Sequence, residues 1–364
     1  MLILFKLLLI IITIITSSTA WNFSKVSLPD DVLIWRFVLW KNRAYLAIPR
    51  WQSGLNNSVT LLEAPWIEPE TMFLMNIPQP SVKPFPSLQE QSLGDDCDNI
   101  ISVTGLDIDS RGRLWVLDSP TSVDCSAKII IFDLHRRTEV SRSTLTGVAT
   151  KELKTIVIDP TIGLYGYRGY VGDPGDESII VYNIGRTGQK WWKLKLLHKS
   201  TVPRIYTGDL AVSKRNSRLY LTGYKSLDLF SIDLDILRYE DFLSFPRKVF
   251  RHRNASVTWH GIKLGLSSGL LCDSKDGLHY FLVTEYASVR WDTKYDLKAT
   301  NHEILEQSEQ VLSITDYRTD SQKNVWGLVN GHYPFNKRKN LIATKKWNPT
   351  SRVIQILHSR SFKP

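Results

Sequence analysis

The chain of 364 residues has few cysteines: Cys97, Cys125 and Cys272 are all it contains. Three cysteines are too few for a small domain built around disulfides, and in an oxidising compartment one pair and one free thiol are the default. Cys97 and Cys125 flank a predicted hairpin, so we expect them to form the pair. The context of Cys272, GLLCDSKDG, indicates a buried small residue rather than a nucleophile.

Long apolar runs are absent beyond the N-terminus. An apolar run follows Lys6, and the sequence STA at residues 18–20 supplies the small side chains of a cleavage site. This run is too short to be preferred as a membrane span. We therefore expect residues 1–20 to be a signal peptide and residues 21–364 to form a single secreted domain with no membrane association.

The net charge of +10 is moderate for this length, with basic clusters at residues 247–253 and 337–339. Such a surface keeps a protein soluble, and it also attracts acidic extracellular partners or anionic ligands. Nucleic-acid binding is not expected, because the chain has no recognition motif and is predicted to be secreted. Secretion gives meaning to three glycosylation sequons, which begin at Asn22, Asn56 and Asn254.

Helical periodicity is scarce, and short alternating runs rich in aromatic and β-branched residues are frequent instead. The stretch GLDIDSRGRLWVLDS, residues 105–119, is typical of a β-hairpin around a polar turn. Its plan of strand, turn, aromatic-containing strand, loop and third strand recurs at intervals of roughly 45 to 60 residues, the spacing of propeller blades. Six such units are present, beginning at Asp31, Gly105, Thr155, Gly208, Ser268 and Ser313. We predict an all-β fold, a six-bladed β-propeller, because radial packing hides the edges and faces of each sheet.

The recurrence also explains the acidic residues of the hairpins. The equivalent turn carries an aspartate in four units: Asp109, Asp159, Asp273 and Asp320. A turn aspartate accepts hydrogen bonds from backbone amides two residues further on, and we expect Gly112 or Gly277 to supply a positive φ. We interpret these aspartates as structural rather than catalytic or metal-binding.

The repeated units resemble the yellow/major royal jelly protein family of insects. The matching pieces are AYLAIPRW, the PFP at residues 84–86, GLDIDSRGRLWVLDS with KIIIFDL after it, YVGD with SIIVYNI, and VWGLVNG near the end. The resemblance covers almost all of the predicted mature chain and implies a secreted six-bladed propeller. Many members have cysteines where Ser110 and Arg290 stand here, so the usual disulfide pattern of the family does not carry over.

The functions that the resemblance implies are diverse, and the fold does not choose among them. Our leading hypothesis is a non-catalytic secreted propeller that acts in cuticle, eggshell or pigmentation (melanin-related) biology. It would bind a small aromatic amine or catechol in its channel, with extracellular matrix or eggshell components as further partners. The alternatives are a dopachrome-converting enzyme and a salivary protein that binds biogenic amines.

The candidate ligand site follows from the same resemblance. Amine-binding relatives have a stretch similar to TDYRTDSQKNVWGLVNGH, and Thr315 and Asn330 match their polar ligand-contacting positions. Asp316 is the candidate charge partner for an amine. His332 and Ser313 stand where those relatives have aromatic rings. Lost rings remove cation–π attraction, so high-affinity amine scavenging is not expected.

Catalytic motifs are absent from the sequence. It has no G-x-S-x-G or H-E-x-x-H motif, no phosphate-binding loop and no zinc-like set of ligands. We therefore predict no cofactor and no metal; Asp209, Asp316 and Asn330 are the one set comparable to the calcium ligands of propeller hydrolases. His260 and His332 are the catalytic candidates, because histidine titrates near neutral pH. A lone histidine beside an aromatic residue is more often structural, and the enzyme question stays open.

Overall fold

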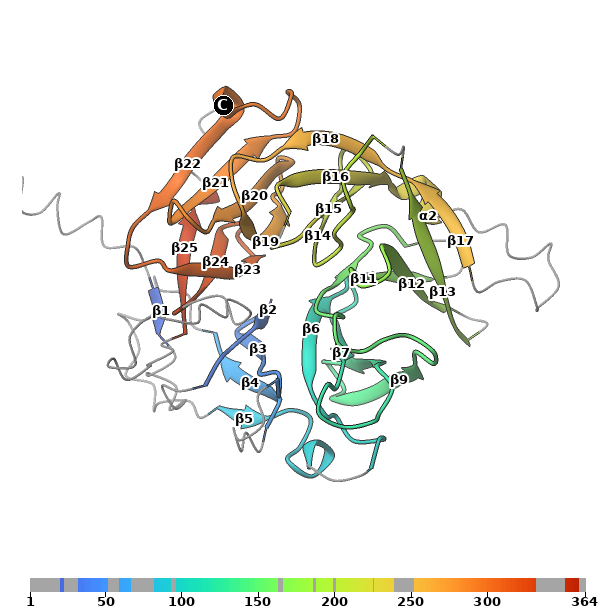
Figure 1. Ribbon diagram of the computed structural model, residues 1–364. Helices are drawn as coiled ribbons and strands as arrows, with labels where there is room; N and C mark the ends of the chain where they lie inside the picture. The colour runs from blue at the N-terminus through green and yellow to red at the C-terminus, as the bar shows by residue number, and fades with distance from the viewer. Residues whose placement is uncertain are drawn as a thin grey trace, which may run out of the picture.

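Six sheets of four or five strands are arranged around a central axis in the computed structural model (Figure 1). The structure describes residues 20–22, 32–51, 59–66, 82–92, 96–162, 166–185, 188–198, 201–224, 226–238, 252–331 and 351–359. The arrangement confirms the six-bladed β-propeller that the recurring hairpins predict.

Each blade is described from the axis outward. Blade 1 contains β2 (Arg36–Trp40), β3 (Arg43–Ala47), β4 (Leu61–Pro65) and β5 (Lys83–Pro84). Blade 2 contains β6 (Val103–Ile108), β7 (Arg113–Asp118), β8 (Lys128–Asp133) and β9 (Thr138–Thr144). Blade 3 contains β10 (Ile156–Ile158), β11 (Tyr167–Asp173), β12 (Ser178–Gly185), β13 (Gly188–Leu197) and β17 (His252–Ser256).

The second half of the ring follows the same plan. Blade 4 contains β14 (Asp209–Ser213), β15 (Arg218–Thr222), β16 (Asp228–Asp233) and β18 (Thr258–Ile262). Blade 5 contains β19 (Ser267–Cys272), β20 (Gly277–Leu282), β21 (Ala287–Asp292) and β22 (His302–Gln307). Blade 6 contains β23 (Ser313–Thr319), β24 (Val325–Asn330), β25 (Arg352–Leu357) and β1 (Ala20–Asn22). The short helices are α2 (Leu234–Arg238), η2 (Gln89–Gln91) and η4 (Ala299–Asn301).

The ring is closed on itself. The innermost strands are β2, β6, β10, β14, β19 and β23, and each contacts the innermost strands of both neighbouring blades. Strand β1, from the N-terminal region, pairs antiparallel with β25, so the outermost strand of blade 6 comes from the opposite end of the chain. A second departure from the simple plan is β17, which pairs parallel with β13 as a fifth strand of blade 3 before the chain enters blade 4. The repeat pattern predicts neither strand.

The hairpin turns depend on their aspartates, as the sequence predicts. The Asp109 carboxylate accepts hydrogen bonds from the backbone N–H groups of Arg111 at 2.9 Å and Arg113 at 3.2 Å. It also accepts the indole N–H of the buried Trp115 at 2.9 Å. Gly112 has a φ of 73°, the left-handed conformation expected at this turn.

The same plan recurs in blades 5 and 6 with local changes. Asp320 accepts the backbone N–H groups of Gln322 and Asn324, each at 2.9 Å, and the Trp326 indole N–H at 2.8 Å. In blade 5 the expectation of a positive φ at Gly277 is wrong, because Asp276 takes that conformation instead with a φ of 63°. Asp276 follows the turn aspartate by three residues, as Gly112 does in blade 2, so it occupies the equivalent position, and an aspartate tolerates the left-handed region there.

The hydrophobic core lies between adjacent blades rather than on the axis. Phe85 of the segment following β5, for example, packs edge-on against Tyr45 of β3 at 5.0 Å and against Phe132 of β8 at 5.2 Å, measured between ring centroids. A disulfide joins Cys97 to Cys125, whose Cα atoms are 5.5 Å apart. In the described part of the chain, no helix is long and apolar enough to cross a membrane.

Candidate binding site in the central channel

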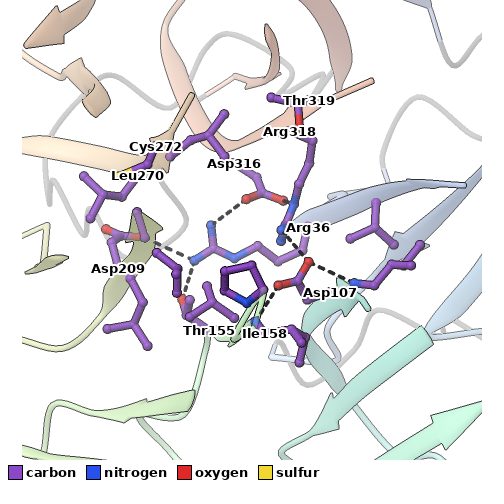
Figure 2. Close-up of a pocket in the computed structure, with 18 of the residues that line it drawn as sticks. Arg36, Asp107, Thr155, Ile158, Asp209, Leu270, Cys272, Asp316, Arg318 and Thr319 are labelled. Carbon is purple, nitrogen blue, oxygen red and sulfur yellow. Dashed lines mark hydrogen bonds and ion pairs between the residues drawn. The ribbon is translucent and has the colours of Figure 1, made fainter. Parts of the chain in front are cut away.

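A cavity of about 280 Å³ lies in the central channel, and all six blades contribute to its lining. Figure 2 shows it from close by, with Arg36 extending between Asp209 and Asp316. The lining residues are Arg36, Val38, Leu39, Asp107, Ile108, Thr155, Val157, Ile158, Pro160, Asp209, Leu210, Ala211, Val212, Lys214, Leu270, Leu271, Cys272, Asp316, Arg318 and Thr319. Aliphatic side chains thus surround a group of charged ones, which we call the axial ion cluster: Arg36, Arg318, Asp107, Asp209 and Asp316.

Arg36 connects three other blades to its own. Its Nη2 donates to Thr155 Oγ1, just before β10, at 2.7 Å and to Asp209 Oδ1 on β14 at 3.3 Å. Its Nη1 lies 3.5 Å from Asp316 Oδ1 on β23 and donates to the backbone carbonyl of Thr315. The side chain is 3% exposed, so these pairs are shielded from water and from salt.

Arg318 forms the second half of the cluster. Its Nε donates to Asp316 Oδ2 at 3.2 Å, and its Nη1 donates to Asp107 Oδ1 at 3.2 Å. Burial lowers the pKa of the Arg318 guanidinium, but the Asp316 and Asp107 carboxylates outweigh burial and hold the pKa above its usual range. Asp107 Oδ2 also accepts the backbone N–H of Ile158 at 2.7 Å, which ties blade 2 to blade 3.

Within the cluster three carboxylates face two guanidinium groups, and Lys214, which also lines the cavity, brings the charged lining groups to three of each sign. Burial raises the pKa of both Asp107 and Asp209 despite the opposing effect of Arg318 on the first and of Arg36 and Lys263 on the second. Asp209 is 3% exposed, and its Oδ2 accepts no hydrogen bond from the described residues. A buried carboxylate oxygen without a donor is costly, so this atom is the natural position for a donor supplied by a ligand.

Lys263 is a further buried cation near Asp209. Its Nζ donates to Ser267 Oγ at 2.7 Å and to Thr222 Oγ1, and Thr222 is the cross-strand partner of Asp209. Burial lowers the pKa of Lys263 to about 7, although the Asp209 and Asp228 carboxylates act to raise it. No carboxylate of the described residues forms an ion pair with this ammonium group within 4.0 Å.

The sequence-predicted ligand residues fall into two groups. Asp316 lines the cavity as part of the axial ion cluster, whereas Thr315 and Asn330 do not line it and are at most 1% exposed. Asn330 Nδ2 donates to Thr315 Oγ1 at 2.7 Å and to the Ile34 carbonyl at 2.9 Å, and its Oδ1 accepts from Ser351 Oγ at 2.6 Å. These groups therefore connect strands of blades 6 and 1. His332 lies outside the described residues.

His260, the other histidine candidate, lies on β18 outside the channel lining. Its Nε2 is 2.8 Å from Ser231 Oγ, and its ring packs near those of Tyr220 and Trp291. Burial, with a smaller effect of Arg218, lowers its pKa to about 4. The ring is therefore neutral at neutral pH and is a poorer general base than a histidine with a pKa near 7.

The remaining predicted sites can be placed in part. Asn254 is exposed on β17, the side chain of Asn22 on β1 is not described, and Asn56 lies outside the described residues. Cys272 is free and lines the channel cavity. Among the residues that the structure describes, no group of three or more His, Cys, Asp or Glu side chains is arranged to hold a metal ion. Asp209 and Asp316, which together with Asn330 form the set compared with calcium ligands, both contact Arg36 instead.

Sequence reasoning missed the two arginines of the cluster. Arg36 interrupts an apolar run in IWRFV, and a charged residue at such a strand position is the signal that was available, whereas Arg318 stands among polar residues in TDYRT and gives no such signal. What no pattern indicates is that the two strands meet at the axis, because β2 and β23 lie at opposite ends of the chain.

The closed ring of blades and the charged cavity on its axis define a six-bladed β-propeller with an axial cavity. The family model described as Major royal jelly protein matches residues 101–358, which is more than half of the chain. The chain belongs to this family, as its motifs predict.

The chain is also similar to individual proteins and to solved structures. Protein yellow of Drosophila melanogaster and that of Drosophila simulans are each 24% identical to it, in matches that cover 79% of this chain and 56% of the relative. The chain thus spans about half the length of these curated relatives. A virginiamycin B lyase from Staphylococcus aureus has a TM-score of 0.50 and 11% identity, covering 86% of this chain and 83% of that one. At this identity the likeness shows the fold alone.

Proposed function

We propose that this protein is a secreted propeller that acts without catalysis, by binding a small aromatic amine or catecholamine in its central channel, in cuticle, eggshell or pigmentation biology. The observation that carries the binding proposal is Asp209 Oδ2, a buried carboxylate oxygen with no hydrogen-bond donor from the described residues, in a cavity with aliphatic walls. Secretion is supported by the predicted signal peptide and by the family.

The open acceptor at Asp209 favours a cationic ligand. An ammonium group beside Asp209 would supply the missing donor in a charge-assisted hydrogen bond. A carboxylate whose pKa is raised by burial gains most from a new cation, because Arg36 and Lys263 do not fully offset the cost of burying its charge. An anionic ligand at the same position would place a second negative charge beside the Asp209 carboxylate.

The cavity walls favour a compact apolar body. Val38, Ile108, Val157, Leu210 and Leu270 contribute aliphatic surface, which stabilises a bound ring by about 25 cal/mol per Å² removed from water. None of the described lining residues is aromatic, so the ring gains no stacking and its ammonium group gains no cation–π attraction. The volume of about 280 Å³ lies near the lower end of ligand pockets, which suits a molecule with a single ring system.

Calorimetry with dopamine and serotonin tests the proposal. Dopamine is expected to bind, and 4-methylcatechol, which keeps the ring but lacks the amine, is expected to bind at least about tenfold more weakly, the equivalent of about 1.4 kcal/mol. Asp209→Asn removes the charge with little change of shape and should weaken dopamine binding to a similar extent. Asp124→Asn, at an exposed aspartate away from the channel, is the matched control. No heat with any amine at high protein concentration would overturn the proposal.

The dopachrome assay separates binding from catalysis. The purified protein is expected to remove dopachrome no faster than buffer, because the cavity lining contains no described histidine and each arginine is held by carboxylates. A faster rate that is lost in His332→Ala or His260→Ala would replace the non-catalytic proposal with an enzymatic one. Unchanged rates in both variants together with dopamine binding would support it.

A further inference from the structure

A second cavity, of about 560 Å³, lies away from the channel, between β18 of blade 4 and the loop that follows β21 in blade 5. Its lining residues are Trp259, His260, Trp291, Thr293, Lys294, Tyr295, Asp296, Leu297 and Lys298, and we call it the outer cavity. It shares no lining residue with the channel cavity. We propose that the outer cavity binds an acidic carbohydrate, a function separate from amine binding in the channel.

Two aromatic rings in this cavity are exposed to solvent. Trp259 is 44% exposed and Tyr295 is 60% exposed, whereas most large rings among the described residues are buried. Trp259 is also held in place, because its indole N–H donates to Asp228 Oδ1 at 3.0 Å. The electron-rich face of an aromatic ring attracts the polarised C–H groups on the face of a pyranose ring, and a fixed ring loses little entropy on binding.

The loop that forms the other side of the outer cavity is anchored. The Trp291 indole N–H donates to the Asp296 carbonyl at 3.2 Å, and Asn301 Nδ2 donates to the same carbonyl at 2.9 Å. Thr293 Oγ1 accepts from Asn216 Nδ2 at 3.0 Å, which connects the loop to blade 4. These bonds hold the wall in one conformation, so a ligand need not order it.

The charges around the outer cavity favour an anion. Among the lining residues, Lys298 Nζ is paired with Asp296 Oδ2 at 3.0 Å, which leaves the positive charge of Lys294 in excess. Behind the lining, the Asp228 carboxylate that holds Trp259 and the Arg218 guanidinium near His260 add one charge of each sign. His260 adds no negative charge, and its lowered pKa reflects in part the positive field of Arg218 nearby. This balance disfavours the rival use of an aromatic site, the capture of an organic cation. The net charge of +10 would draw acidic polymers toward the protein in general.

The ligand must satisfy both kinds of lining. A purely apolar molecule would offer no acceptor to the Lys294 ammonium group, and a bare anion would leave the exposed rings unused. A sugar ring has apolar C–H faces and hydrogen-bonding edges, and a carboxylate or sulfate group on it can pair with Lys294. An acidic oligosaccharide therefore matches rings, polar groups and charge together.

Tryptophan fluorescence and calorimetry with four probes test the inference. A hyaluronan tetrasaccharide and a heparin tetrasaccharide carry the acidic groups, chitotetraose is a neutral sugar of the same length, and indole-3-acetate is an anion without a sugar. At least one acidic tetrasaccharide is expected to bind at least about fivefold more tightly than chitotetraose and indole-3-acetate. Equal binding of the neutral sugar, tighter binding of indole-3-acetate, or no binding of either acidic sugar would overturn the proposal.

Variants locate the binding. Trp259→Ala and Tyr295→Ala should each weaken the acidic sugar about fivefold to tenfold, the size expected for one lost ring contact. Lys294→Gln should weaken it and reduce its salt dependence. The controls are Tyr286→Ala, at another exposed ring, and Lys151→Gln, at another exposed lysine, neither of which lines the outer cavity. Equal losses in the controls would indicate non-specific attraction and would contradict a built site. Dopamine binding, which depends on Asp209, should be unchanged in all five variants.

Discussion

Two turn aspartates, Asp109 and Asp320, and two channel aspartates, Asp209 and Asp316, are all buried, but their partners lie at different distances along the chain. Asp109 and Asp320 bond to groups within six residues of themselves, which are backbone amides, side-chain N–H groups and, for Asp109, the Arg113 guanidinium. Asp209 and Asp316 instead pair with Arg36 across the ring, far away in the sequence. Both carboxylate oxygens accept hydrogen bonds in all four turn aspartates, although Asp159 and Asp273 also use the more distant Arg238 and Arg290. Asp209 of the channel set instead has one carboxylate oxygen without a donor. A buried carboxylate with complete bonding is structural, and one with an oxygen left over marks a place where a ligand can act.

The largest effect on stability is expected when the axial ion cluster loses Arg36, its central cation. Arg36→Met keeps much of the side-chain volume but leaves Asp209 and Asp316 buried without this partner, which should lower the free energy of unfolding by about 3 to 5 kcal/mol. Urea denaturation followed by tryptophan fluorescence measures the loss. Arg136→Met, at an exposed arginine, is the control and should change little. A loss below about 1 kcal/mol in Arg36→Met would show that the network does not hold the blades together.

A turn aspartate should cost less, because its bonds are local and partly replaceable by water. Asp109→Ala removes the acceptor of two backbone N–H groups and leaves the indole N–H of Trp115 buried without it, so a loss of about 2 to 3 kcal/mol is expected. The same denaturation assay with Asp124→Ala as the exposed control checks it. If Asp109→Ala proves as stable as the wild type, the structural interpretation of the turns fails.

Lys263, the buried cation near Asp209, should make the free energy of unfolding depend on pH. Its pKa is 10.5 in the unfolded chain and about 7 when folded, so between these values the unfolded state binds more protons and wild-type stability rises with pH. Below pH 7 the folded protein bears the full cost of the buried ammonium group. Lys263→Met should therefore be more stable than the wild type at pH 6, and the gain should shrink as the pH rises toward 10. A difference that is constant with pH would contradict the assignment.

The smallest effect on stability is expected for Asp209→Asn, although Asp209 has the largest role in the proposed binding. Folding raises the pKa of Asp209, so above the unfolded value of 3.8 its ionisation favours the unfolded state. Asp209→Asn removes this penalty and loses one ion pair with Arg36, and the two changes should cancel to within about 1 kcal/mol. A stability loss as large as that of Arg36→Met would place Asp209 among the structural residues. Denaturation curves at pH 7 decide this.

The sequence predicts those parts of the structure that form between residues close together in the chain. Each hairpin carries its own strand alternation and turn aspartate, so the six blades can be recognised one at a time. The axial ion cluster joins β2, β6, β14 and β23, and no local pattern indicates which side chains meet there. Asp316 was found through the family resemblance, and Arg36 and Arg318 were not. Thr315 and Asn330 show the limit of such transfer, since here their polar atoms bond to one another and to blade 1.

The pairing of β1 with β25 has a mechanical consequence. Most strand pairs join segments adjacent in the sequence and can form early, but this pair joins the two ends of the chain and must close the largest loop in the protein. Ring closure should therefore be the last step of folding. A force applied to the two ends of the mature chain, which is expected to begin near Trp21, would load the short pairing of Trp21 with Val353 and Asn22 with Arg352 before any blade, so the ring would open there while the blades are still folded.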